Sequence, residues 1–291
     1  MPILSQINVD IVAGVATNLV QIQGSVAEGN ATTASGSSSH AEGVFTTAQG
    51  AYSHSEGEYS KAQGEASHAE GDSTIASGYA SHAEGGATTA SSNWSHSEGY
   101  NTQSINVATH AEGYYTTATG NYGSHAEGRG SIAIGQSSHA EGQETTAVGP
   151  WNHTEGYLTT SMMQYSHAEG VYTLASANAS HAEGGATTAS GVGSHSEGWY
   201  TTASGDYSHA GGNYSTASGT VSFIHSANST VSGLRSAVLG GQNITATSDD
   251  TVYMPKVELA ETGQGIIMKS PDGTRYKLTI ANGGTVTVSP A

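Results

Sequence analysis

Small and polar side chains alternate along most of this chain with a fixed period. From Ser25 to about Gly219 the sequence repeats every fourteen residues, with one half of the type Ser-His-Ala-Glu-Gly, as at 39–43, and one half of the type Thr-Thr-Ala-Ser-Gly, as at 187–191. The only irregular step is one of fifteen residues between His110 and His125. The pattern predicts two five-residue strands in each unit, each followed by a two-residue turn.

The alternation within a strand assigns its side chains to two faces. Ser39, Ala41 and Gly43 share one face, and His40 and Glu42 share the other. In the second half of each unit, one Thr and the Ala fall on the small-residue face. Two short strands closed into a fourteen-residue coil lie too near each other for bulky side chains, so the small face must point inward. We therefore predict an all-β, narrow parallel β-solenoid of roughly 14 coils, stacked at about 4.8 Å.

Composition agrees with a thin core. Of 291 residues, 40 are glycine, and the apolar fraction of 35% rests largely on alanine. Such a composition without order would indicate a disordered chain, but a disordered chain has no reason to keep a period. A coil that buries only alanine and small polar side chains gains little free energy from burial against the backbone entropy that it loses. We therefore expect further burial between chains.

Charge and residue usage exclude several classes of function. The formal charge is −17, with 24 acidic and 7 basic residues, and no Lys or Arg precedes Lys61. We expect no nucleic-acid partner and no anionic membrane surface. No apolar run approaches the roughly 20 residues of a membrane span, so we expect no membrane insertion, and no secretory signal is evident. The chain has no cysteine, which excludes disulfides and thiol chemistry.

The pattern Ser-x-Ala-x-Gly at seven-residue intervals resembles the head repeat of the YadA-type trimeric autotransporter adhesins. Ser-Ile-Ala-Ile-Gly at 131–135 is the closest local match, and Ser-Ala-Val-Leu-Gly at 236–240 looks like a degenerate copy. The resemblance implies a left-handed parallel β-roll of fourteen-residue coils that assembles as a homotrimer. It also implies that the outward side chains of one strand lie at the trimer axis.

Those outward positions hold His and Glu here, where the adhesin heads carry Val and Ile. We interpret them as a charge-assisted ladder between subunits, in which the histidines gain protons on assembly and the pKa of each rises. Two alternatives are a solvated polar face and a metal ion bound by three chains; a dozen equal sites favour architecture, so we expect no metal and no cofactor. The predicted ladder consists of His40, Glu42, His54, Glu56, His68, Glu70, His82, Glu84, His96, Glu98, His110, Glu112, His125, Glu127, His139, Glu141, His153, Glu155, His167, Glu169, His181, Glu183, His195 and Glu197.

Aromatic residues gather in the predicted turns, where stacked coils align them into columns. They either shield the edges of the roll or form a platform for a glycan or protein receptor. The predicted receptor-binding residues are Trp94, Trp151, Trp199, Tyr200 and Tyr207.

A catalytic role is not expected. His, Glu and Ser recur in every coil, whereas a catalytic triad needs one preorganised site with an oxyanion hole. Paired carboxylates across chains could still serve glycoside hydrolysis, which leaves a carbohydrate-degrading tail spike as a third alternative.

The remaining segments lie outside the repeat. Residues 1–24 are rich in Ile, Val and Leu and predict an attachment or capping segment, and 220–250 predict a transition segment after the repeat ends. In 251–291, strands at 252–259, 265–269, 274–280 and 285–289 are predicted, with Ser-Pro-Asp-Gly at 270–273 as a turn. This small β-meander caps the roll, promotes trimerisation or forms the tip.

We see no heptad stalk and no C-terminal membrane anchor, and therefore predict a structural fibre of a bacteriophage virion, a tail or head fibre. Its predicted partners are its own copies, other virion proteins at one terminus, and a host surface glycan or protein. The alternative is a bacterial surface adhesin.

Overall fold

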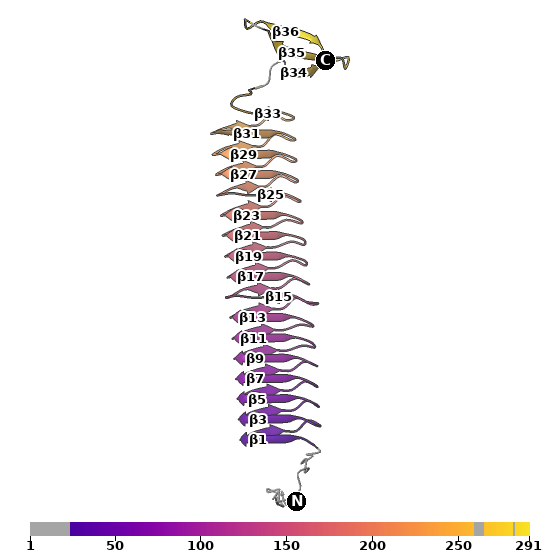
Figure 1. Cartoon of the computed structure of the whole chain (residues 1–291), viewed down its shortest axis with the longest axis vertical. Coiled ribbons are helices and arrows are strands. Elements are labelled where there is room, and N and C mark those ends of the chain that lie inside the picture. The colour runs from indigo at the N-terminus through magenta and orange to yellow at the C-terminus, as the bar shows by residue number, and fades with distance from the viewer. Residues whose placement is uncertain (1–23, 259–264, 282) are drawn as a thin grey trace, which may run out of the picture.

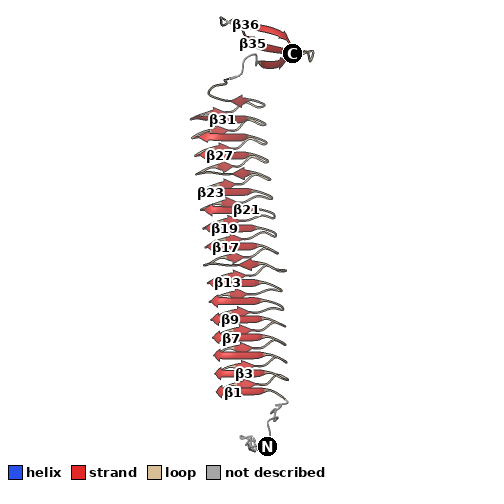
Figure 2. Ribbon diagram, viewed as in Figure 1, coloured by secondary structure: helices blue, strands red, loops and turns tan. Residues whose placement is uncertain are grey.

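The computed structural model describes residues 24–258, 265–281 and 283–291. Described residues form strands, turns and bends but no helix (Figure 2), which confirms the all-β prediction. Figure 1 shows a straight stack of coils that ends in a small separate sheet. The predicted attachment segment at 1–24 lies outside the described residues except for Gly24. No helix in the described part of the chain has the length and apolar character needed to cross a membrane.

One side of the stack is a parallel sheet of seventeen strands, one from each coil. Most have five residues, while β15, β25 and β33 have two and β31 has six. The strands are β1 (Val26–Asn30), β3 (His40–Val44), β5 (His54–Glu58), β7 (His68–Asp72), β9 (His82–Gly86), β11 (His96–Tyr100), β13 (His110–Tyr114), β15 (His125–Ala126), β17 (His139–Gln143), β19 (His153–Tyr157), β21 (His167–Val171), β23 (His181–Gly185), β25 (His195–Ser196), β27 (His209–Asn213), β29 (Phe223–Ala227), β31 (Ala237–Gln242) and β33 (Val252–Tyr253).

The opposite side is a parallel sheet of sixteen strands, each of two residues. Its members are β2 (Thr33–Ala34), β4 (Thr47–Ala48), β6 (Lys61–Ala62), β8 (Ile75–Ala76), β10 (Thr89–Ala90), β12 (Gln103–Ser104), β14 (Thr117–Ala118), β16 (Ile132–Ala133), β18 (Thr146–Ala147), β20 (Thr160–Ser161), β22 (Leu174–Ala175), β24 (Thr188–Ala189), β26 (Thr202–Ala203), β28 (Thr216–Ala217), β30 (Thr230–Val231) and β32 (Thr245–Ala246). Each strand pairs with the equivalent strand of the next coil, so that His54 lies opposite His68 and Glu56 opposite Glu70.

The two halves of a unit differ more than the sequence pattern predicts. The long strand begins at the histidine and not at the preceding serine, because the Ser39 hydroxyl donates to the carbonyl of Gly36 at 2.8 Å and belongs to the turn. The second half is a strand over only two residues. It ends early because the N–H groups of Gln49 and Gly50 both donate to the carbonyl of Ala62, which turns the chain out of the ladder.

The interior of the roll holds the residues that the alternation assigned to it. Ala41 and Ala48 are fully buried, as are their equivalents in the following coils, and Ser39 and Thr46 are buried beside them. Towards the C-terminal end the core changes, because Ile224, Val231 and Val238 replace alanine. The predicted orientation of the two faces is therefore confirmed.

The coils continue beyond Gly219. The sequence predicts a transition segment at 220–250, but these residues contain β29 to β32. The two-residue strand β33 then adds the last strand to the seventeen-stranded sheet. The His-x-Glu-Gly pattern is lost there, yet Ile224 and Val238 still face the core and pair in register. The roll therefore has about 16 coils, and at about 4.8 Å per coil it is roughly 75 Å long.

The turns place bulky residues in the left-handed region of backbone space. Tyr52 has a φ of 59° and Tyr59 a φ of 56°, and equivalent turn residues repeat these values along the roll. This conformation is costly for residues other than glycine. The fifteen-residue step between His110 and His125 is accommodated in one such turn, where Tyr122 and Gly123 both have positive φ.

Beyond β33 the chain forms a three-stranded antiparallel sheet, drawn in yellow in Figure 1. It consists of β34 (Ile266–Lys269), β35 (Arg275–Ile280) and β36 (Val286–Pro290). The predicted Ser-Pro-Asp-Gly turn joins the first two strands, and the Ser270 N–H donates to the carbonyl of Thr274. Within 252–258, the described part of the strand predicted at 252–259, only the two residues of β33 form a strand; residue 259 lies outside the described residues.

Candidate functional site

The outward face of the long strands carries a continuous column of histidines beside a column of glutamates. We call these two rows the His–Glu column; it comprises all 24 residues predicted as the ladder. In-register pairing produces it, since each strand places His over His and Glu over Glu of the coil before. The column lies on the long-strand sheet from His40 to Glu197, and its side chains are about one third exposed.

The imidazole rings stack on one another along the column. The ring centroids of His54 and His68 are 4.8 Å apart with planes 6° from parallel, and those of His68 and His82 are 4.9 Å apart at 1°. The stack ends where the ring of His209 turns to 68° from that of His195. Rings held this closely would repel one another if each carried a proton.

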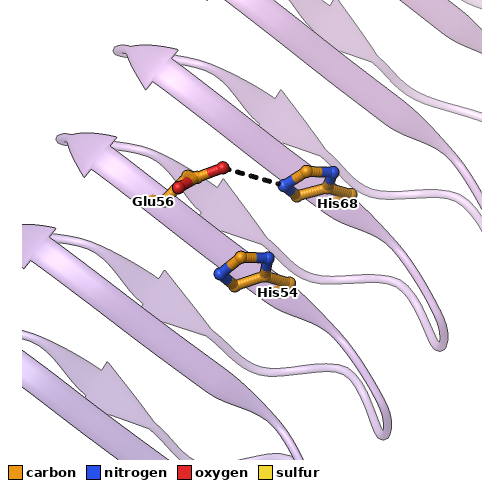
Figure 3. A group of neighbouring side chains, drawn as sticks. All are labelled: His54, Glu56 and His68. Atoms are coloured by element: carbon orange, nitrogen blue, oxygen red, sulfur yellow. Dashed lines mark ion pairs between the residues drawn. The ribbon is translucent and has the colours of Figure 1, made fainter.

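Most histidines of the column lie near a glutamate of the preceding coil. Nε2 of His68 lies 3.4 Å from Oε1 of Glu56, as the dashed line in Figure 3 marks. The same arrangement joins His82 to Glu70 at 3.4 Å. Other contacts join His and Glu of the same coil, such as His110 and Glu112 at 3.7 Å. The His–Glu ion pairs of the structure therefore lie within one chain, both between successive coils and within them; the predicted pairing between subunits remains a proposal.

Most of these histidine nitrogens are buried without a hydrogen-bond partner. The Nε2 atoms from His40 to His181 are enclosed by the column although part of each ring is exposed. At the C-terminal end the distance between histidine and glutamate is shorter. Nε2 of His195 lies 3.0 Å from Oε1 of Glu183, and Nε2 of His209 lies 3.1 Å from Oε1 of Glu197. A buried nitrogen without a partner is unusual and needs an explanation.

Burial lowers the pKa of the histidines in the single chain. For His82 and His110 the largest cause is loss of solvation, the next is the positive charge of the neighbouring imidazoles, and nearby glutamates only partly offset both. The same direction and leading cause hold for the pKa of His54, His139 and His167. This direction is the opposite of the rise that we expected for the trimer axis.

The glutamates share protons along their own column. Hydrogen bonding between carboxyls of neighbouring coils, chiefly with Glu98, raises the pKa of Glu84 to about 7 and that of Glu112 to about 8. The intervening Glu98 accepts from Glu112, which lowers its pKa to about 2. The pKa values of Glu141 and Glu169 again rise to about 7. Below about pH 7 alternate carboxyls thus hold a proton, because a continuous row of carboxylates would repel itself.

A groove follows the glutamate row along the axis of the roll. Its volume is about 850 Å³ between Glu84 and Gly170, and it is lined by the glutamates and by the glycine that follows each of them. The glycines are required there: Gly99 has a φ of 106°, and a Cβ on it would lie 2.2 Å from the carbonyl oxygen of Gly113. The outer surface beside the carboxylates is therefore bare backbone.

The predicted receptor-binding residues are all exposed on the described roll. The exposed fractions are 59% for Trp94, 47% for Trp151, 51% for Trp199, 47% for Tyr200 and 65% for Tyr207. Trp199 and Tyr200 meet edge to face at 5.6 Å, but Trp94 and Trp151 lie in other coils, so the structure does not bring all five together.

Several of these residues stack on aromatic neighbours in adjacent coils. Trp151 stacks on Tyr165 at 5.1 Å, and Tyr200 stacks on Tyr214 at 4.7 Å. Trp94 meets Tyr79 edge to face at 5.9 Å. The columns are thus broken into separate aromatic clusters along the rod.

Sequence reasoning missed a second row of aromatic residues at the ends of the long strands. Tyr100 stacks on Tyr114 at 5.4 Å, and Tyr114 meets the turn residue Tyr115 edge to face at 4.5 Å. Tyr157 and Tyr172 form a similar edge-to-face pair. The available signal was their position directly after Glu-Gly, which places them outward beside the groove.

Comparison with known families identifies the repeat. The profile of the YadA head domain repeat (two copies) matches residues 55–81, 69–91, 126–150 and 197–222, all within the roll. No curated protein matches the sequence. The resemblance predicted from Ser-x-Ala-x-Gly is thus confirmed. Repeats of this type are typical of trimeric autotransporter adhesins.

Proposed function

We propose, from the premise that this chain carries YadA-type head repeats, that it is a non-enzymatic adhesive fibre acting as a homotrimer. We place it in a bacteriophage virion as a tail or head fibre, with other virion proteins at one terminus and a host surface glycan or protein as its target. The observation that carries the proposal is the set of exposed aromatic clusters on a long rod. Tyr and Trp are favoured anchors at binding surfaces because they offer large area at low entropic cost.

The thin core supports assembly into a trimer. From β3 to β28 each coil buries mainly alanine, serine and threonine, so contacts between chains would add stabilisation that the single roll lacks. The His–Glu column, whose side chains are about one third exposed, and its groove form the face that the family arrangement places at the trimer axis. Three such faces could interlock through charge-assisted hydrogen bonds.

The oligomeric state tests the first part of the proposal. Multi-angle light scattering on the full chain should give a particle of about three times the 29.4 kDa chain mass. A stable, monodisperse monomer would end the trimer arrangement.

Adhesion is tested with substitutions that leave the core intact. A quintuple variant with alanine at Trp94, Trp151, Trp199, Tyr200 and Tyr207 should lose binding to host cells or to an array of surface glycans. The matched control replaces Tyr52 and Tyr122 with alanine, since these are as exposed as Tyr207 but are not proposed to bind. If the two variants bind alike, the aromatic residues only shield the edges of the roll.

A bacterial surface adhesin is the second candidate, and the repeat match favours it. Antibody labelling separates the two settings, because an antibody against a virion fibre would label purified phage particles and one against an adhesin would label the surface of the producing cells.

The lack of enzymatic activity is also part of the proposal. A reducing-end assay on host polysaccharide should remain at background.

A further inference from the structure

We propose that the His–Glu column binds divalent transition-metal ions, each held by Nε2 of one or two histidines and by carboxylate oxygens of neighbouring coils. The first observation is the row of buried Nε2 atoms that have no hydrogen-bond partner. The second is that these atoms and the carboxylate oxygens lie close together in repeated groups. In the group of His54, Glu56 and His68, the potential ligand atoms all lie within 4.8 Å of one another.

The distances fit an ion better than they fit a hydrogen bond. The 3.4 Å between Nε2 of His68 and Oε1 of Glu56 is long for a charge-assisted hydrogen bond. Two ligands that each lie about 2.0–2.2 Å from one zinc ion are about 3–4 Å apart. An ion placed between these atoms therefore needs only small movements of side chains that are already one third exposed.

In the middle of the column each nitrogen has carboxylate oxygens on two sides. Nε2 of His125 lies 3.7 Å from Oε1 of Glu112 and 3.7 Å from Oε2 of Glu127. His110 is placed in the same way between Glu98 and Glu112, at 3.8 and 3.7 Å. One nitrogen and two carboxylate oxygens are a ligand set that zinc accepts, with water completing the shell.

The chemistry of the ligands selects the kind of ion. Imidazole suits zinc, nickel and copper, whereas calcium and magnesium prefer oxygen ligands alone. Metal binding requires unprotonated nitrogens, and an imidazole with an ordinary pKa near 6.5 is already mostly unprotonated at about pH 7.5. A cation would also relieve the repulsion within the glutamate row.

The shared glutamates limit how many ions one chain can hold. Glu112 lies near both His110 and His125, so filling one site removes a ligand from the next. Divalent ions on successive coils would also lie only about 5 Å apart and repel each other. We therefore expect occupation of alternate coils, about one ion for every two histidines.

The test uses the full chain after removal of metals with a chelator. Equilibrium dialysis at about pH 7.5 should show several bound Zn²⁺ ions per chain and a rise in melting temperature, with Ca²⁺ at least about tenfold weaker. With Cu²⁺ as a probe, electron paramagnetic resonance should show hyperfine coupling to imidazole nitrogen. Equal binding of Ca²⁺ and Zn²⁺, or a copper signal without nitrogen coupling, would overturn the proposal.

Substitutions locate the site. A variant with His96→Gln, His110→Gln, His125→Gln and His139→Gln should bind about a third less Zn²⁺, because four of the twelve histidines of the His–Glu column are removed. The matched control places glutamine at Thr89, Thr117, Thr146 and Thr160, which face outward on the short strands, and should bind as the parent does. Unchanged Zn²⁺ binding in the histidine variant would place the ions elsewhere. Circular dichroism in chelator checks its fold, and if it does not fold, the copper spectrum of the parent chain decides.

Discussion

Oε1 of Glu56 lies 3.4 Å from Nε2 of His68, although the two residues belong to neighbouring coils and are twelve positions apart in the chain. The repeated pattern instead suggests a pairing of His and Glu two residues apart within one coil. Contacts of this kind join most successive coils of the His–Glu column. Protonation of one layer therefore affects the layers on both sides.

Acid should weaken the metal-free chain through its histidines. The folded pKa values of His54, His82, His110 and His139 are lowered by burial. The unfolded chain therefore takes up protons first as the pH falls below about 6.5, and stability is lost there. Replacing these four residues with glutamine should reduce the loss of melting temperature between about pH 7.5 and 5.5, measured in chelator.

The control for this experiment is His225→Gln, whose imidazole is 61% exposed and lies beyond the stacked rings. It should follow the parent curve. Parallel melting curves for parent and quadruple variant across the same pH range would show that the stacked histidines do not resist protonation.

Alkali should weaken the chain through its glutamates. The pKa values of Glu84, Glu112, Glu141 and Glu169 are raised to about 7–8 by hydrogen bonding with neighbouring carboxyls. Their contribution to stability is fully present below the unfolded pKa near 4.5 and is lost as the pH rises through the folded values. Glutamine at these four positions should flatten the decline of melting temperature between about pH 5 and 8.5.

The matched control replaces Glu65 and Glu144 with glutamine. Both residues are exposed and lie outside the His–Glu column. The control should decline with pH as the parent does. A column variant that declines equally steeply would argue against proton sharing. Histidines and glutamates act in opposite directions between about pH 4.5 and 6.5, so each set needs its own variant.

A methyl group on the groove floor should disrupt stacking of the coils. Gly99→Ala would place Cβ 2.2 Å from the carbonyl oxygen of Gly113, at a φ of 106°. We expect a loss of about 3 kcal/mol or more in the free energy of unfolding, since the clash is with backbone and the conformation is unfavourable. Gly123→Ala also has a positive φ but meets nothing within 4 Å, and it should cost only about 1 kcal/mol. Equal losses in denaturant titrations of the two variants would contradict a close-packed floor.

The unit of the fold is the whole coil. Deleting residues 64–77 removes β7 and β8 together and should preserve folding, because β5 can then pair with β9 in the same register. Deleting only 64–70 would stack long strands on short ones and should abolish the native circular dichroism spectrum. If both deletions fold and melt alike, the two halves of a unit are interchangeable.

Local alternation was sufficient to predict which residues enter the core. The inward positions of Ala41 and Ala48 follow from the two-residue period of a strand and from the narrowness of a fourteen-residue coil. The hairpin of β34 and β35 likewise follows from Ser-Pro-Asp-Gly, since a tight turn is set by its own residues.

Stacking decided what the repeat alone left open. Coils continue beyond Gly219 because Ile224 and Val238 still fit inward and pair in register without the His-x-Glu-Gly pattern. The partner of His68 is Glu56, and Tyr114 joins Tyr100 and Tyr115, because the neighbours of an outward side chain belong mainly to the coils above and below. The lowered histidine pKa and the shared glutamate protons arise in the same way. Stacking at about 4.8 Å buries each imidazole, which is the largest cause of its lowered pKa, and it also brings identical groups close enough to interact.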